Sequence, residues 1–200
     1  MDRLKSDFST VGIVLMGVGI VINIVMGRIV TTLSLPLYLD SIGTIFVGAV
    51  AGPWVGALAG IISNLIAAFF GNPANFLPYI PVAAIIGFMA GLFSRYGWFK
   101  LWWKFILAGV ITGVVAALIS APITAYVNSG VVGTGMDALT AAFRGMGMST
   151  LQANFLQGLS TDPLDKSISY LLVYSIIQAL PNRYLAVSYT HLTLPTSDLV

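Results

Sequence analysis

The chain has 200 residues, of which 58% are hydrophobic and only 8% are charged, whereas soluble domains average about 25% charged residues. This number of charged residues is too small to cover the surface of a soluble domain. We therefore predict one integral membrane domain and exclude a soluble enzyme. The net charge of +2 says little about nucleic acid, but the basic residues are scattered singly, which argues against a nucleic-acid-binding patch. With no cysteine and one histidine, the sequence also argues against a metal site, a cofactor site and Ser–His or thiol catalysis.

Apolar runs separated by turn residues predict an all-α membrane protein with six transmembrane helices. A helix needs about 20 apolar residues to cross a hydrocarbon core of about 30 Å. The expected helices cover residues 9–33, 40–51, 53–70, 80–96, 101–128 and 164–185. The second helix is short and stops at Gly52, because Pro53 restricts the residue before it and is welcome only in the first turn of the next helix.

The segment 129–163 is predicted to be a long external loop between the last two helices. It is glycine-rich at first and then shows apolar residues every three or four positions, which favours two short amphipathic surface helices. Asp162 and Asp165 flank Pro163 at its end, and we interpret them as caps of the last helix rather than as a catalytic pair.

Lysine and arginine residues predict the orientation. Cytoplasmic termini would place six basic residues inside and three outside, as the positive-inside rule favours. We predict that residues 1–186 form the membrane domain. Residues 187–200 are polar and resemble translated adapter sequence, so we interpret them as a non-native tail that contains His191.

Polar and small residues inside the spans are the first functional candidates. Arg28 and Asp40 are expected at the same depth and are predicted to form an ion pair, while a contact between Asp40 and a substrate stays open. Asn64 is predicted to make an interhelical hydrogen bond, with a substrate contact as the alternative. The pairs of glycines four residues apart in 53–70 and 80–96 predict close internal packing, whereas those of the first helix suit a partner subunit equally well.

Amide and phenol side chains gather toward the expected external face. A mostly apolar pocket with a few such groups suits a small organic ligand that has rings and hydrogen-bonding groups. The candidates for substrate binding are Asp40, Asn75, Tyr79, Tyr126, Asn128, Gln152, Asn154, Tyr170 and Tyr174. The aromatic residues fit an interfacial belt equally well, and for Tyr38 and Tyr79 the belt is the preferred interpretation.

Two stretches resemble a known family. The hairpin "LDSIGTIFVGAVAGPWVGALAGIISN" and the ending "DPLDKSISYLLVYSIIQALPNR" are similar to the substrate-binding S component of energy-coupling factor (ECF) vitamin transporters, with the riboflavin-type branch most similar. The resemblance covers about residues 10–186 and implies a multi-pass protein of a prokaryotic cell membrane. Such a subunit binds a vitamin or related micronutrient externally and associates with a transmembrane T component and cytoplasmic ATPases.

In that family, small residues of the first helix, often Ala-x-x-x-Ala, dock to the T component. Here the comparable positions are Gly12, Gly19, Asn23 and Gly27, which are the candidate docking residues although they depart from the alanine pattern. The resemblance also implies that the loaded subunit topples in the bilayer.

Two other functions fit the composition. A six-span sensor module of a truncated receptor would be followed by a signalling domain. A self-sufficient secondary carrier would want a coupling-ion site, yet residues 80–128 contain no acidic residue.

Overall fold

The computed structural model describes residues 8–179, which form helices and short 3-10 turns with no strand among them. The helices are α2 (Thr10–Thr32), α3 (Ile42–Ala51), α4 (Pro53–Phe70), α5 (Ile80–Arg95), α6 (Trp102–Val127), α7 (Asp137–Gly145) and α8 (Thr150–Ala179). The 3-10 turns are η1 (Pro73–Asn75), η2 (Leu77–Tyr79) and η3 (Trp98–Lys100). The predicted tail 187–200 lies outside the described residues.

The first five predicted helices agree with the structure to within one helical turn, and α4 begins at Pro53 as expected for a proline in a first turn. The predicted start of the last helix is wrong. α8 begins at Thr150 and continues through Pro163 for 30 residues. The second amphipathic helix that we expected is therefore the first half of α8, and α7 is the short helix that remains.

Packing against α6 explains why Pro163 does not end α8. A Cβ atom on Gly113 of α6 would lie 2.5 Å from the Cα atom of Pro163, so the two backbones meet where the proline stands. The α6–α8 contact is the most extensive between any two elements described. Tertiary packing on both sides of the proline thus holds a helix that local preference would interrupt.

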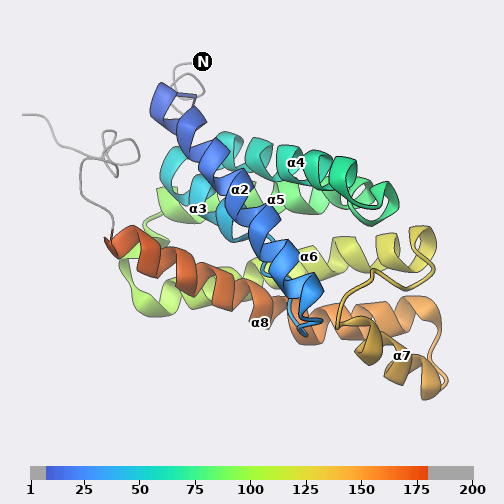
Figure 1. Ribbon diagram of the computed structural model, residues 1–200. Helices are drawn as coiled ribbons and strands as arrows, with labels where there is room; N and C mark the ends of the chain where they lie inside the picture. Colours follow the sequence, from blue (N-terminus) through green and yellow to red (C-terminus); the bar gives the residue numbers. More distant parts are fainter. Residues whose placement is uncertain (1–7, 180–200) are drawn as a thin grey trace, which may run out of the picture.

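The helices form two groups with α3 between them (Figure 1). α4 and α5 pack side by side, α6 and α8 form the other pair, and α2 crosses α3 and α4. All ten residues of α3 are buried. A helix that is apolar on all sides is stable only when other elements bury it on all sides. α3 is therefore the centre of the hydrophobic core.

Glycines allow the closest crossings. A Cβ atom on Gly43 of α3 would lie 1.9 Å from the carbonyl oxygen of Gly19 on α2, and one on Gly87 of α5 would lie 2.1 Å from that of Gly56 on α4. Real side chains do not tolerate such distances. The predicted internal packing of the glycine pairs in α4 and α5 is confirmed.

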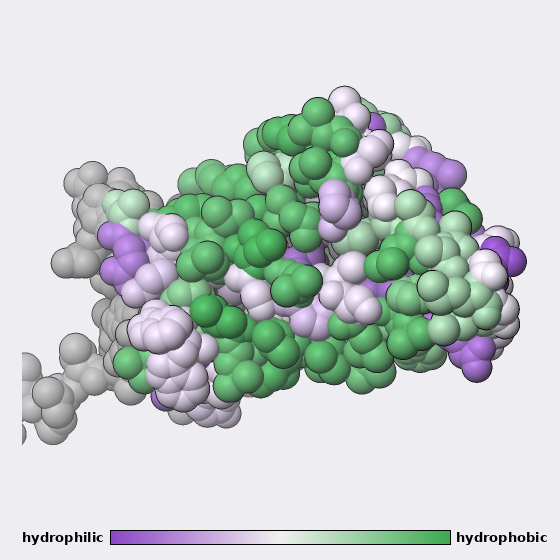
Figure 2. Space-filling view, turned by 90° about the horizontal axis from the view of Figure 1, so that it is seen from below, coloured by the Kyte–Doolittle hydropathy of each residue, from purple (hydrophilic) through white to green (hydrophobic). Residues whose placement is uncertain are grey.

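Apolar side chains dominate much of the outer surface, as Figure 2 shows for one face. Val14 and Val21 of α2 remain 62% and 59% exposed, which is costly in water and favourable in lipid. Four segments of the described chain, Thr10–Thr32, Pro53–Phe70, Pro73–Arg95 and Trp102–Val127, are long and apolar enough to cross a membrane, and α3 is a shorter apolar helix. The fold is that of a multi-pass membrane protein.

Candidate substrate-binding cavity

A cavity of about 340 Å³ lies between the two helix groups. Its wall is formed by α2 to α6, by α8 and by three connecting segments that meet at one end of the bundle, residues 33–41, 71–79 and 131–134. The volume is within the range of small-molecule sites, about 300–1,000 Å³. The cavity can therefore hold a small-molecule ligand.

The lining combines apolar surface with polar groups that converge on the space. Its charged residues are Arg28, Asp40, Asp162 and Lys166; its amides are Asn23, Asn64, Asn72, Asn75, Asn154 and Gln157; and its aromatic rings are Tyr38, Phe70, Phe76 and Tyr79. A binding pocket with few precisely placed polar groups has this character.

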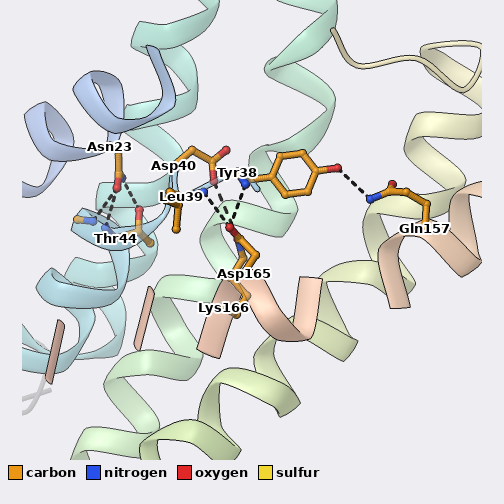
Figure 3. Close-up of polar contacts among 9 residues, drawn as sticks. Asn23, Tyr38, Leu39, Asp40, Thr44, Gln157, Asp165 and Lys166 are labelled. Carbon is orange, nitrogen blue, oxygen red and sulfur yellow. Dashed lines mark hydrogen bonds and ion pairs between the residues drawn. The ribbon is translucent and has the colours of Figure 1, made fainter. Parts of the chain in front are cut away.

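Asn23 of α2 organises the inner end of the cavity (Figure 3). Its Oδ1 atom accepts hydrogen bonds from the backbone N–H groups of Gly43 (2.7 Å) and Thr44 (3.2 Å). Its Nδ2 atom donates to the hydroxyls of Thr44 (2.7 Å) and Ser63 (2.9 Å). The N-cap residue of α3, Ser41, makes no capping bond with its side chain, so Asn23 caps α3 from another helix.

Asp165 of α8 holds the connection between α2 and α3. Its Oδ1 atom accepts hydrogen bonds from the backbone N–H groups of Tyr38 and Leu39, both at 2.9 Å. Its Oδ2 atom accepts from the Nζ atom of Lys166 at 2.5 Å, and the same Nζ atom lies 4.0 Å from Oδ1 of Asp40. One buried ion pair therefore fixes the position of Tyr38 and Asp40 beside the cavity (Figure 3).

Tyr38 points along the cavity wall toward Gln157, whose Nε2 atom donates to the phenol oxygen at 3.4 Å (Figure 3). Burial, followed by the nearby Asp162 carboxylate, holds the pKa of the Tyr38 phenol well above its ordinary value. At neutral pH the phenol therefore keeps its proton and can donate a hydrogen bond into the cavity.

The opposite wall is built around Tyr79. Its phenol oxygen lies 2.7 Å from the Thr124 hydroxyl and accepts from the Nδ2 atom of Asn128 at 3.4 Å. Asn75 donates to the carbonyl of Val132 at 3.3 Å. These bonds connect the segments 71–79 and 131–134 with the end of α6.

The predicted ion pair between Arg28 and Asp40 does not form. Arg28 instead donates to the carbonyl of Phe70 at 2.8 Å, because the end of α4 faces it, and Asp40 lies beside Lys166. The predicted interhelical bond of Asn64 is also wrong, since its Nδ2 atom donates to the Phe76 carbonyl in a connecting segment at 3.3 Å.

Four of the predicted substrate-binding residues line the cavity, namely Asp40, Asn75, Tyr79 and Asn154, and Asn128 touches Tyr79. The other four lie elsewhere. Tyr126 is 75% exposed, and Tyr170 is fully buried with its hydroxyl 3.0 Å from that of Thr112. Tyr174 stacks on Phe105, and Gln152 bonds Ser149. Tyr170 and Tyr174 are predicted to bind substrate because they lie on one face of the same helix. In the structure that face turns toward the core.

The docking candidates on α2 face different ways. Asn23 and Gly19 are buried against α3, and Gly27 lines the cavity, where a Cβ atom would lie 3.5 Å from that of Asp40. Gly12 is buried near the helix start and bonds Ser9. A largely exposed face of α2 lies opposite the buried one.

Sequence reasoning missed the residues of α8 that form one wall, Gln157, Asp162 and Lys166, together with the positioning residue Asp165. We interpreted the two aspartates as helix caps, but both lie in the interior of α8 and are buried. Two acids and a lysine within residues 162–166 of an otherwise weakly charged chain were themselves a signal of function.

An all-helical membrane fold that encloses a small-molecule cavity at one end of the bundle defines the class: a membrane-embedded binding protein for a small organic solute. The comparison with protein families agrees. The family described as "ECF transporter, substrate-specific component" matches residues 11–193, and the chain belongs to that family. It is a substrate-binding transporter subunit rather than an enzyme, and family membership implies a small-molecule substrate and association with ECF T and ATPase components. Neither a search of curated proteins nor a search of solved structures found a match.

Proposed function

We propose that the chain binds a vitamin or related micronutrient in the cavity between α2, α4 and α8, and delivers it for ATP-driven uptake with separate T and ATPase subunits. The cavity itself carries the proposal, because its volume and its mixture of rings and amides suit a vitamin-sized ligand. The motifs similar to the riboflavin-type branch support a ring-containing ligand, and four aromatic rings in the lining are consistent with one.

The proposed arrangement has six spans, with cytoplasmic termini and the cavity opening outward. The distribution of lysine and arginine supports it, and α3 and α8 would supply the spans beyond the four long apolar segments. The loaded subunit would then topple in the bilayer and release its ligand on the cytoplasmic side. Exposed valines on α2 suit a body that moves within lipid.

Ligand binding tests the proposal directly. The purified full chain in detergent is titrated with a panel of vitamins while its melting temperature is followed, because a ligand at about 100 times its Kd stabilises the folded state by about 2.7 kcal/mol. Uptake of the bound vitamin is then measured in cells that express the chain with and without a T component and ATPases. We expect stabilisation by at least one compound and uptake only with the complete transporter.

A matched pair of variants locates the site. Ala67 of α4 lines the cavity, whereas Leu65 of the same helix is 46% exposed on the outside. We expect Ala67→Trp to fill the space and abolish ligand-induced stabilisation, and Leu65→Trp to preserve it. Equal binding by both variants would place the ligand elsewhere and refute the proposed site.

A further inference from the structure

The wall that α8 contributes to the cavity presents hydrogen-bond acceptors without partners. Asn154 and Asp162 line the space and are only 2% and 5% exposed, yet the Oδ1 atom of each has no hydrogen-bond partner. Leaving such an atom unpaired in a buried position costs about 1–3 kcal/mol, and more for a charged group. Both residues therefore need a donor that the described chain does not supply.

The orientation of Asn154 is fixed by its own backbone contact. Its Nδ2 atom donates to the carbonyl oxygen of Thr150 at 2.8 Å, and a carbonyl can only accept. The amide cannot be turned around without losing this bond, so it is the oxygen that remains open.

The charges around Asp162 do not balance. Asp40, Asp162 and Asp165 supply three carboxylates to this region, and Lys166 supplies one ammonium group. That ammonium already binds Asp165 and lies 4.0 Å from Asp40, whereas no ion pair within 4.0 Å joins it to Asp162. The guanidinium of Arg28 is a second cation in the lining, but it donates to the Phe70 carbonyl at the end of α4 and forms no ion pair with Asp162 within 4.0 Å. Three carboxyl groups therefore face two cations, and Asp162 is the acid of the three that no ammonium or guanidinium group approaches within 4.0 Å.

We infer that the ligand carries a positively charged N–H donor, such as an ammonium, an amidinium or a protonated ring nitrogen, which binds Asp162 and Asn154 on α8. This inference rests on the proposed function, since it names the chemical class of the molecule that the cavity takes. A cation there satisfies both open oxygen atoms and neutralises the excess carboxylate. The rings of Tyr38 and Tyr79 line the same space and suit the aromatic part of such a molecule.

A pair of compounds that differ in charge tests the inference on the purified full chain at pH 7. Pyridoxamine, which has an ammonium group, is compared with pyridoxine, which has a hydroxyl in its place. Binding is followed by the shift in melting temperature. In addition, the protein is incubated with yeast extract and washed, and the compounds that it retains are identified by mass spectrometry.

Asp162→Asn is the informative variant, because it keeps the shape of the side chain and removes the charge. We expect it to weaken binding of the cationic compound by about 10- to 100-fold, the effect of losing a charge-assisted hydrogen bond. Ser160→Ala is the control on the same helix. Ser160 is exposed, donates to the Leu156 carbonyl one turn earlier in α8 and does not line the cavity. It should leave both the binding and the preference for the cation unchanged.

The outcomes separate this inference from the proposed function. A retained compound with a basic nitrogen, lost from Asp162→Asn and kept by Ser160→Ala, supports both. A neutral or anionic compound, or a cation that Asp162→Asn binds as tightly as the wild type does, overturns the inference and leaves the proposed function standing. If no compound is retained and none shifts the melting temperature, the cavity is not a ligand site and both are overturned.

Discussion

Asn23→Ala tests whether the side chain that α2 inserts between α3 and α4 is structural. The alanine removes four hydrogen bonds at once, two to the backbone N–H groups of Gly43 and Thr44 and two to the hydroxyls of Thr44 and Ser63. The N–H groups are those of the first turn of α3, which have no partner within the helix. The hydroxyls can bond elsewhere, so the cost comes mainly from the uncapped helix.

The expected loss follows from these contacts. Removing an N-cap costs about 0.5–2 kcal/mol, and a buried donor left unpaired costs about 1–3 kcal/mol. Water in the adjacent cavity can reach part of the exposed backbone and limits the sum to about 1–3 kcal/mol. For a chain of this size, each kcal/mol lowers the melting temperature by about 2–4 °C, so a decrease of about 2–12 °C is expected.

Thermal unfolding of the isolated subunit in detergent, followed by tryptophan fluorescence, measures this decrease. Gly17→Ala on the same helix is the control, because a Cβ atom on Gly17 meets nothing within 4 Å. We expect that variant to melt at or slightly above the wild-type temperature, since alanine favours a helix by about 0.5–1 kcal/mol relative to glycine.

The result also separates two roles of Asn23. If Asn23→Ala melts within about 1 °C of the wild type, below the range that loss of the cap predicts, then Asn23 does not cap α3. Failure of that variant to co-purify with a T component would then restore the docking role that the sequence suggested. A large decrease in melting temperature supports the capping role.

Three further changes probe the packing and the polar contacts. Gly87→Ala places a methyl group against the Gly56 backbone and should destabilise the chain by about 1–3 kcal/mol, measured as loss of the monodisperse peak after heating. Asp165→Asn or Lys166→Met alone should cost about 3–5 kcal/mol by leaving a buried charge unpaired, and the double variant should cost less than the sum in thermal unfolding. Tyr79→Phe removes two hydrogen bonds and should cost about 1 kcal/mol in the same assay.

Each of these changes has an outcome that contradicts its reasoning. Gly145→Ala has open space around it, so an equal loss at Gly145 and Gly87 would show that the close crossing is not the cause. Additive effects at Asp165 and Lys166 would mean that the two side chains do not interact. A Tyr79→Phe variant as stable as the wild type would mean that water replaces its hydroxyl.

The sequence predicted the parts of the fold that depend on local signals. Pro53 marks the start of α4, and the apolar run before it gives α3 its length. Pro163 carries the same local signal but lies inside α8, because α6 packs along both sides of it. Local preference could not reveal that contact between distant parts of the chain.

The sequence predicted those cavity-lining residues that their polar side chains alone mark as candidates for ligand binding. Asn75, Tyr79 and Asn154 are polar residues near the helix ends, and they line the cavity. The partners of Asp165 are backbone N–H groups about 126 residues earlier in the chain, and no spacing within α8 indicates them. Helical periodicity likewise places Tyr170 and Tyr174 on one face of the last helix. It does not indicate that this face turns into the core.

The burial of α3 has a consequence for how the chain enters the membrane during synthesis. Its 10 residues span about 15 Å, about half of the hydrocarbon core, and fall short of the roughly 20 apolar residues that a segment needs to cross alone. α4 follows after Gly52 and is long and apolar enough to cross. The insertion machinery would therefore have to release α3 and α4 into the lipid together, as a single hairpin, and α3 would become fully enclosed only when α8 has been made.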